Sequence, residues 1–156
     1  MRLRLLLFIG IGLLSCASSR DTVSTVSANV RNSLVDYATS LVGTPYKYGG
    51  TSPVQGFDCS GFTGFVMRKY GYVLPRSSRD QGGTGRTLNA RDARPGDLVF
   101  FGKGKRIEHV AIVVRSTRNK LEIVHSSSGH GVVVEDVLRS RYWTNLLLYA
   151  IDLSSL

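Results

Sequence analysis

The sequence is poor in cysteine, proline and long apolar runs, and each shortage narrows what the chain can be. Its 156 residues include two cysteines, which allow at most one internal disulfide, between Cys16 and Cys59. Four prolines beside 17 glycines give no collagen-like or linker-like bias, and no internal repeat of solenoid period is present. Hydrophobic residues make up 42%, which argues against disorder, so we expect one domain with its own core.

The longest apolar stretch, Leu5 to Leu14, follows a basic start at Arg2 and Arg4. It is too short to cross a membrane as a helix and is typical of a signal peptide, which we predict over residues 1–15. The Leu-Leu-Ser-Cys sequence that closes it resembles a bacterial lipobox. This resemblance implies that Cys16 is lipidated and anchors the protein to a membrane. An ordinary signal peptide cut elsewhere is the alternative.

Acidic residues are outnumbered, with 11 Asp and Glu against 20 Lys and Arg, and the formal charge is +9. Without Arg2 and Arg4 the charge falls to +7. The basic residues are scattered and no stacking-aromatic motif accompanies them, so we expect no nucleic-acid partner. An anionic polymer outside the cell, such as a cell wall, suits the same charge.

Acylation of Cys16 would leave Cys59 as an unpaired thiol in an exported protein, which indicates a reactive group. A polar loop leads to Cys59 at the start of a helix that we predict to run to Tyr70 and to end at Gly71. The free N–H groups of a helix N-terminus favour thiolate over thiol. A buried structural cysteine is the alternative, but its polar neighbours Asp58 and Ser60 argue against a core position. We therefore interpret Cys59 as a nucleophile.

The rest of the chain predicts helices first and strands later. Residues 16–28 are small and polar and indicate a tether, and apolar residues at helical spacing predict a helix over residues 29–42. A short helical turn is expected after Ser77 or Ser78, and another within residues 137–143. Strands are predicted at residues 97–101, 109–115, 121–125, 132–134 and 146–153. This order favours an α+β fold over residues 29–156, with N-terminal helices packed on a mostly antiparallel sheet of five to six strands.

A cysteine nucleophile needs a base, and the base needs a group to orient it. His109 opens one predicted strand and His125 ends the next, so a hairpin around residues 117–120 places both away from its turn. There His125 can bond to His109 and fix its tautomer. His130, between two glycines, is interpreted as a solvated loop residue.

Two alternatives remain for the two strand-end histidines. Both can be structural, with their hydrogen bonds satisfied locally. One Cys and two His can also hold zinc, but no HExxH-type pattern is present, so we expect no metal and no other cofactor.

Six motifs in order resemble the NlpC family of cell-wall cysteine endopeptidases. They are GTPYKYGG at 43–50, FDCSGF at 57–62, PRSS at 75–78, PGDLVFF at 95–101, HVAIV at 109–113 and HSSSGHGV at 125–132. The resemblance implies a papain-like fold and hydrolysis of murein stem peptides, typically between D-glutamate and diaminopimelate. We expect the enzyme to be a monomer.

By position, the resemblance implies that Cys59 is the nucleophile, His109 the general base and His125 the third member that orients the base. Tyr46 matches the tyrosine usually assigned to the oxyanion hole, and a packing aromatic is the alternative. The implied substrate-binding positions are two that grip the free amine of the stem peptide, Asp58 and Ser60, and two that line the same cleft, Arg76 and Ser77.

The sequence thus predicts a lipid-anchored peptidoglycan hydrolase of the bacterial cell envelope, facing the periplasm or lying on the outer face of the cell membrane. No repeat-type wall-binding module is present, so the anchor and the positive charge are expected to localise it. One rival is a papain-like amidase or acyltransferase with the same triad. A second rival is a wall-binding or structural lipoprotein with a disused site, and the intact Cys59, His109, His125 and Tyr46 argue against it.

Overall fold

The computed structural model describes residues 19–156, with side chains from residue 28 onwards. The predicted signal peptide and Cys16 lie outside the described residues. The helices are α1 Ser19–Ser40, α2 Cys59–Lys69, α3 Ser78–Gln81 and α4 Arg141–Leu146, with 3-10 turns η1 Ala90–Asp92, η2 Val137–Arg139 and η3 Leu153–Ser155. The strands are β1 Thr51–Ser52, β2 Gly56–Phe57, β3 Thr87–Leu88, β4 Leu98–Lys103, β5 Arg106–Thr117, β6 Lys120–Ser127, β7 Gly131–Asp136 and β8 Leu147–Ile151.

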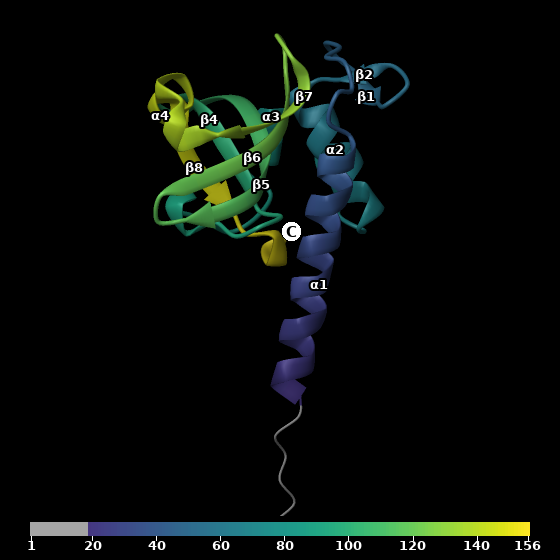
Figure 1. Ribbon diagram of the computed structural model, residues 1–156, viewed down its shortest axis with the longest axis vertical. Helices are drawn as coiled ribbons and strands as arrows, with labels where there is room; N and C mark the ends of the chain where they lie inside the picture. The colour runs from purple at the N-terminus through teal and green to yellow at the C-terminus, as the bar shows by residue number, and fades with distance from the viewer. Residues whose placement is uncertain (1–18) are drawn as a thin grey trace, which may run out of the picture.

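Strands β3 to β8 form one six-stranded sheet in the order β3-β8-β4-β5-β6-β7, and every neighbouring pair is antiparallel (Figure 1). The predicted α+β class and antiparallel sheet are confirmed. Strands β5 and β6 form the predicted hairpin, with Thr117 paired to Lys120 at its turn. The two-residue strands β1, β2 and β3 were not predicted, because two residues carry no readable periodicity.

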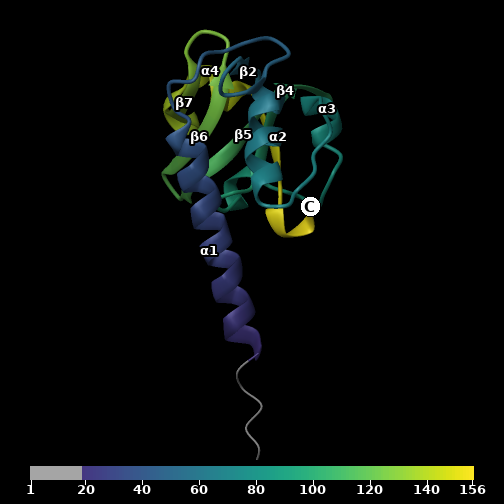
Figure 2. The same ribbon diagram turned by 90° about the vertical axis from the view of Figure 1, so that its right-hand side faces the viewer.

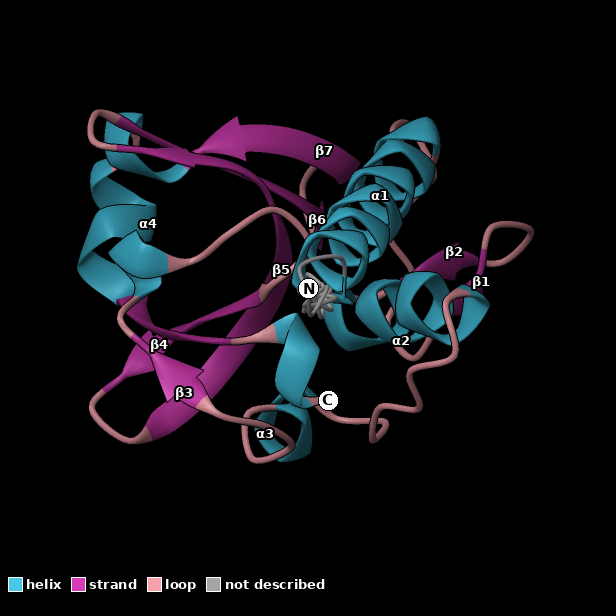
Figure 3. Cartoon of the chain, turned by 90° about the horizontal axis from the view of Figure 1, so that it is seen from below, coloured by secondary structure: helices cyan, strands magenta, loops and turns pink. Residues whose placement is uncertain are grey.

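The sheet is covered on both faces, so its central strands are apolar throughout. Helices α1 and α2 lie side by side on one face, and α4 lies on the other (Figures 2 and 3). In β4, Leu98 and Phe100 pack towards α1 and α2, whereas Val99 and Phe101 pack towards α4. All four are fully buried, and burying each such side chain stabilises the fold by about 1.5–3 kcal/mol.

Helix α1 begins at Ser19, so the predicted helix, residues 29–42, started ten residues too late, and the segment predicted as a tether, residues 16–28, is helical from Ser19 onwards. Serine and threonine are weak helix formers, and their density concealed the continuation of the helical spacing through Val23 and Val26. The N-terminal half of α1 extends beyond the rest of the fold (Figures 1 and 2). Among the helices in residues 19–156, none combines the length and the apolarity needed to span a bilayer.

A buried ion-pair network joins α1 to the sheet. The Arg31 guanidinium donates to the Asp97 Oδ1 atom at 2.6 Å and to the Asp152 Oδ1 atom at 2.9 Å. Both carboxylates are almost completely buried, and Arg86 pairs with the second oxygen of Asp152. These pairs connect α1 to the start of β4 and the end of β8.

Candidate active site

Cys59 is the first residue of α2, as the sequence predicts, and its position is set by the loop before it. The hydroxyl of Ser126, next to His125, donates a buried hydrogen bond to the Phe57 carbonyl at 2.7 Å. The Asp58 N–H donates to the Gly50 carbonyl at 3.2 Å. A Cβ added at Gly61 would lie 2.0 Å from that same carbonyl oxygen, so only glycine permits this approach. Cys59 is therefore held by contacts to both the sheet and the preceding loop.

The Cys59 thiol is protonated at neutral pH in the substrate-free site. Burial raises its pKa, the nearby Asp58 raises it further, and the N–H groups of Val110, Ser60 and Cys59 itself lower it. The expectation that the helix N-terminus leaves a thiolate is wrong here, because the loss of water around the sulfur outweighs the N–H groups. A base must therefore remove the thiol proton.

The two histidines meet at the end of the hairpin away from its turn, as the sequence predicts. The His109 Nε2 and His125 Nδ1 atoms are 2.8 Å apart, and the rings are nearly perpendicular. Burial and the neighbouring His125 lower the pKa of His109 to about 3, so the His109 ring is neutral at neutral pH in the substrate-free site. His130 is exposed in the turn between β6 and β7, as the sequence indicates.

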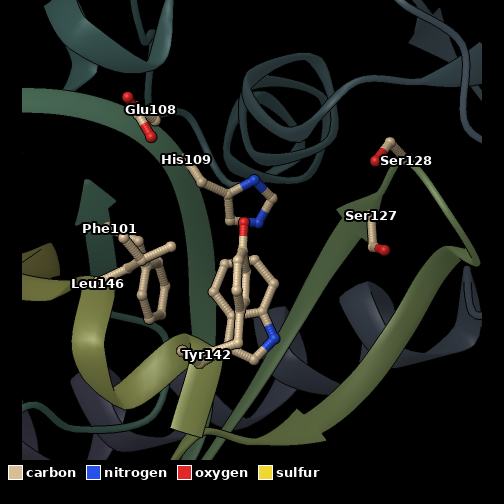
Figure 4. Close-up of a pocket in the computed structure, with 8 residues that line it drawn as sticks. Phe101, Glu108, His109, Ser127, Ser128, Tyr142 and Leu146 are labelled. Carbon is tan, nitrogen blue, oxygen red and sulfur yellow. The ribbon is translucent and has the colours of Figure 1, made fainter. Parts of the chain in front are cut away.

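Helix α2 packs on β5, so Cys59 and His109 come from touching elements. The Val110 N–H that acts on the Cys59 thiol belongs to the residue directly after His109. Two separate cavities lie at this place. One of about 440 Å³ is lined by Cys59, and one of about 320 Å³ is lined by His109 (Figure 4). Glu108 lines both of them.

Tyr46 lines the cavity that contains Cys59. Its loop is fixed by hydrogen bonds between the Lys47 N–H and the Phe57 carbonyl and between the Phe57 N–H and the Pro45 carbonyl, both 3.0 Å. Burial and the nearby Cys59 and Asp58 raise the pKa of Tyr46. The phenol therefore keeps its proton and can donate a hydrogen bond to an oxyanion.

Asp58 caps α2 and also pairs with Arg76 at the wall of the same cavity. Its Oδ1 atom accepts from the Gly61 N–H at 2.7 Å, from Arg76 at 3.0 Å and from the Ser60 hydroxyl at 3.2 Å. Its Oδ2 atom accepts from Arg76 at 2.6 Å and from the Gly49 N–H at 2.9 Å. Burial alone would raise the pKa of Asp58, but the hydrogen bonds from Arg76 and Gly61 outweigh it and lower the pKa.

The predicted site residues Asp58, Ser60, Arg76 and Ser77 all line the cavity that contains Cys59. Five donors surround a carboxylate that offers about four lone-pair sites, so a substrate amine can reach Asp58 only by displacing one of them. Gln81 holds the Arg76 segment in place, since its buried amide donates to the Ser60 carbonyl at 3.0 Å and to the Pro75 carbonyl at 2.9 Å.

No sequence pattern indicates a role for Gln81, Glu108, Glu135 or Trp143. Gln81 is a polar residue that is completely buried. The sequence of a short helix such as α3 does not indicate which of its residues are buried. Glu135 lies one residue beyond the predicted strand 132–134, within β7. Only the pairing of β6 with β7 brings it near the histidines. Among the residues with described side chains, no group of three or more His, Cys, Asp or Glu is placed to hold a metal ion.

Comparisons with known proteins agree with this geometry. The model of the NlpC/P60 family matches residues 43–152. The probable endopeptidase NlpC of Escherichia coli is 36% identical over 118 residues, which cover 75% of this chain and 74% of that protein. The murein DD-endopeptidase MepS/murein LD-carboxypeptidase of the same species is 31% identical over 132 residues, covering 83% and 67%.

The bifunctional muramidase/DL-endopeptidase CwlT of Bacillus subtilis is 39% identical over 109 residues, 68% of this chain but 31% of that protein. This chain therefore spans less than a third of that relative. The crystal structure of the NlpC/p60 domain of the peptidoglycan hydrolase SagA superposes with a TM-score of 0.67 at 30% identity, covering 79% of this chain and 98% of that domain. This likeness confirms the papain-like fold.

Proposed function

Because the chain belongs to the NlpC/P60 family, we propose that it is a peptidoglycan hydrolase, a cysteine endopeptidase that cuts the stem peptides of murein. The observation that carries the proposal is the His109–His125 pair, 2.8 Å apart, together with a thiol at the start of α2, the helix that packs on the strand of His109. A thiol needs a base to attack an amide, and this pair supplies one together with its orienting partner.

In the proposed reaction the Cys59 sulfur bonds to the amide carbonyl carbon while the thiol proton moves to His109. The oxyanion accepts hydrogen bonds from the Tyr46 hydroxyl and the Cys59 N–H. The carbon–nitrogen bond then breaks, and His109 returns the proton to the leaving amine. Water attacks the resulting thioester, His109 takes the water proton, and the Cys59 sulfur leaves and is reprotonated.

The bond between D-glutamate and diaminopimelate is the proposed target, in agreement with the DL-endopeptidase name of the Bacillus relative. The DD-endopeptidase and LD-carboxypeptidase names of the Escherichia relative define the competing bonds. Purified muropeptides incubated with the protein and weighed by mass spectrometry distinguish all three, because each bond gives a different pair of masses. Transfer to an added amine would indicate the acyltransferase rival, and no product at all would favour the wall-binding one. Cys59→Ala is the matched inactive control.

Lipid anchoring at Cys16 and location in the cell envelope are proposals that rest on the sequence alone. We expect the mature N-terminus of protein extracted from membranes to carry acyl mass on Cys16. Cys16→Ala should abolish that mass and leave the chain soluble or tethered by an uncut signal. Unmodified Cys16 in the membrane fraction of the wild type would contradict the lipoprotein assignment.

A further inference from the structure

The histidine pair continues into a carboxylate and an indole on the side away from Cys59. The His125 Nε2 atom lies 2.8 Å from the Glu135 Oε2 atom, and the Trp143 indole N–H donates to the same oxygen at 2.8 Å. Trp143 also packs against His109, with ring centroids 4.9 Å apart and ring planes tilted by 33°. His125 is completely buried, whereas the Glu135 side chain is 38% exposed. The site thus contains four linked side chains beyond the thiol.

The register of the sheet explains why Glu135 reaches His125. His125 pairs with Val133, so Glu135 lies two residues farther along β7 on the same face of the sheet. Side chains at such diagonal positions of an antiparallel pair are within reach when they are long. Trp143 approaches from α4, which covers this face (Figure 3).

These contacts determine where the ring protons lie. A carboxylate can only accept, so the His125 Nε2 atom must carry the proton of that hydrogen bond. The Nδ1 atom of neutral His125 is then an acceptor, and the His109 Nε2 atom must carry the proton shared between the rings. The Nδ1 atom of neutral His109 is left with its lone pair free. Without Glu135, the bond between the two rings can run in either direction, and the reverse direction puts a proton on the His109 Nδ1 atom.

We propose that Glu135 is a positioning residue that sets the tautomers of both histidines, and that Trp143 fixes the accepting oxygen of Glu135. This inference rests on the proposed function, because it assigns the Nδ1 atom of His109 as the atom that takes the Cys59 proton. The Glu135 charge also faces the positive charge that forms on His109 during attack, through the intervening His125 ring.

The other titratable groups around the two rings are Cys59 from α2, Glu108 beside His109 on β5 and His130 from the turn after β6. Helix α4 adds Tyr142, which lines the same cavity as His109 (Figure 4). None of these groups has a hydrogen bond to either ring among the residues with described side chains, whereas Glu135 does.

A purely structural role, in which Glu135 only joins β7 to α4 through Trp143, makes different predictions. It would alter stability without altering the ring protons. The two roles are distinguished by the long-range ¹H–¹⁵N spectra of the histidine rings, which report the tautomer directly and need no substrate.

The variants are Glu135→Leu, which removes the acceptor, Glu135→Gln, which keeps an accepting oxygen but loses the charge, and Trp143→Phe, which keeps the ring and loses the donor. Glu122→Gln on β6 is the matched control, because it makes the same chemical change at a carboxylate that bonds only to surface basic groups. Thermal melts establish that each variant is folded, and Glu135→Gln keeps the test valid if Glu135→Leu does not fold.

In substrate-free wild type and Glu122→Gln we expect both histidines as the Nε2–H tautomer. Glu135→Leu should show mixed tautomers and a kcat on muropeptides lower by about ten- to hundredfold, the range known for outer-shell groups that orient metal-bound histidines, with a smaller change in KM. Glu135→Gln should keep the tautomers and recover part of the lost kcat, and Trp143→Phe should fall between the two.

A proton on the Nδ1 atom of either histidine in the wild type would overturn the proposal. So would unchanged tautomers in Glu135→Leu, whether or not kcat falls. If wild type cuts no muropeptide but shows the expected tautomers that Glu135→Leu disturbs, the positioning role stands and the proposed substrate is wrong.

Discussion

Substitution of Arg76 is the most direct test of how the site recognises a substrate. Of its five N–H donors, three are used, two on Asp58 and one on the Ser60 hydroxyl. The Nε–H group and one N–H of Nη2 have no partner among the residues with described side chains, and the Arg76 side chain is 50% exposed. The cavity is also lined by the carboxylate of Glu108, so Arg76 is the lining side chain that offers a substrate both a positive charge and free N–H donors. A γ-linked D-glutamyl residue keeps its α-carboxylate free, and that group suits the two free donors.

The size of the effect follows from this geometry. A hydrogen bond to a charged group contributes about 1.5–3 kcal/mol when it is well shielded from water. The exposure of Arg76 reduces that value, so we expect about 1.4–2.8 kcal/mol for the contact, or about ten- to hundredfold in kcat/KM. Arg76→Met keeps the aliphatic stem and removes the guanidinium. The loss of folding stability should stay below about 1 kcal/mol, because an exposed ion pair contributes little.

The assay compares three stem peptides, one unmodified, one with its glutamyl α-carboxylate amidated and one with its N-terminal amine acetylated. For the wild type we expect amidation to lower kcat/KM by about the same factor as Arg76→Met, and acetylation to have little effect. The amine-gripping role implied for Asp58 predicts the opposite pattern. Removing Arg76 would then free Asp58 and raise kcat/KM for the unmodified peptide, and acetylation would be the damaging change. That result would refute the assignment of Arg76 as the residue that binds the α-carboxylate of the substrate.

Cys59→Ser should lose at least about a thousandfold in muropeptide hydrolysis with an unchanged thermal melt, since a hydroxyl is a weaker nucleophile beside this base. Because burial raises the pKa of Cys59, the alkylation rate of the free enzyme should keep rising through neutral pH, and a plateau reached in acid would contradict this. Gly61→Ala should reduce activity sharply, since its Cβ would lie 2.0 Å from the Gly50 carbonyl oxygen; normal turnover would mean the loop tolerates the shift. Arg31→Met should lower the free energy of unfolding in urea by about 3–5 kcal/mol, because it leaves the buried Asp97 without its cation and Asp152 with Arg86 alone. Burial acts to raise the pKa of Asp152, but its hydrogen bonds from Ser154 and Arg86 outweigh this and lower the folded pKa. The ionised Asp152 therefore stabilises the fold above its pKa in the unfolded chain, about 4, and this stabilisation is lost as the pH falls below that value. A free energy of unfolding that stays constant through that acid range would refute this role of Asp152.

The sequence predicted the parts of the site that depend on local pattern. A cysteine at a helix start, a short turn between two apolar strands and two histidines at their far ends were enough to bring His109 to His125. Those features lie within single elements or neighbouring strands, where the register follows from the turn.

Features that depend on the relative placement of distant elements could not be predicted in the same way. The predicted strand 132–134 stops short of Glu135, but pairing with β6 extends β7 to Asp136 and brings Glu135 into the site. The pKa of Cys59 also escaped prediction. The direction of its shift depends on how much water the packed sheet removes from around the sulfur, and the position at a helix N-terminus does not determine that.

The resting site holds its reacting groups without charge, which the burial of both explains. In the proposed reaction, attack creates a negative charge on the sulfur or the substrate oxygen and a positive charge on His109. The N–H groups of Cys59, Ser60 and Val110 face the first charge, and His125 backed by Glu135 faces the second. These groups are fixed before the substrate arrives, so their stabilising effect falls mainly on the charge-separated state and lowers the barrier to attack. A site in this form keeps the thiol protonated and less prone to oxidation until a substrate is bound.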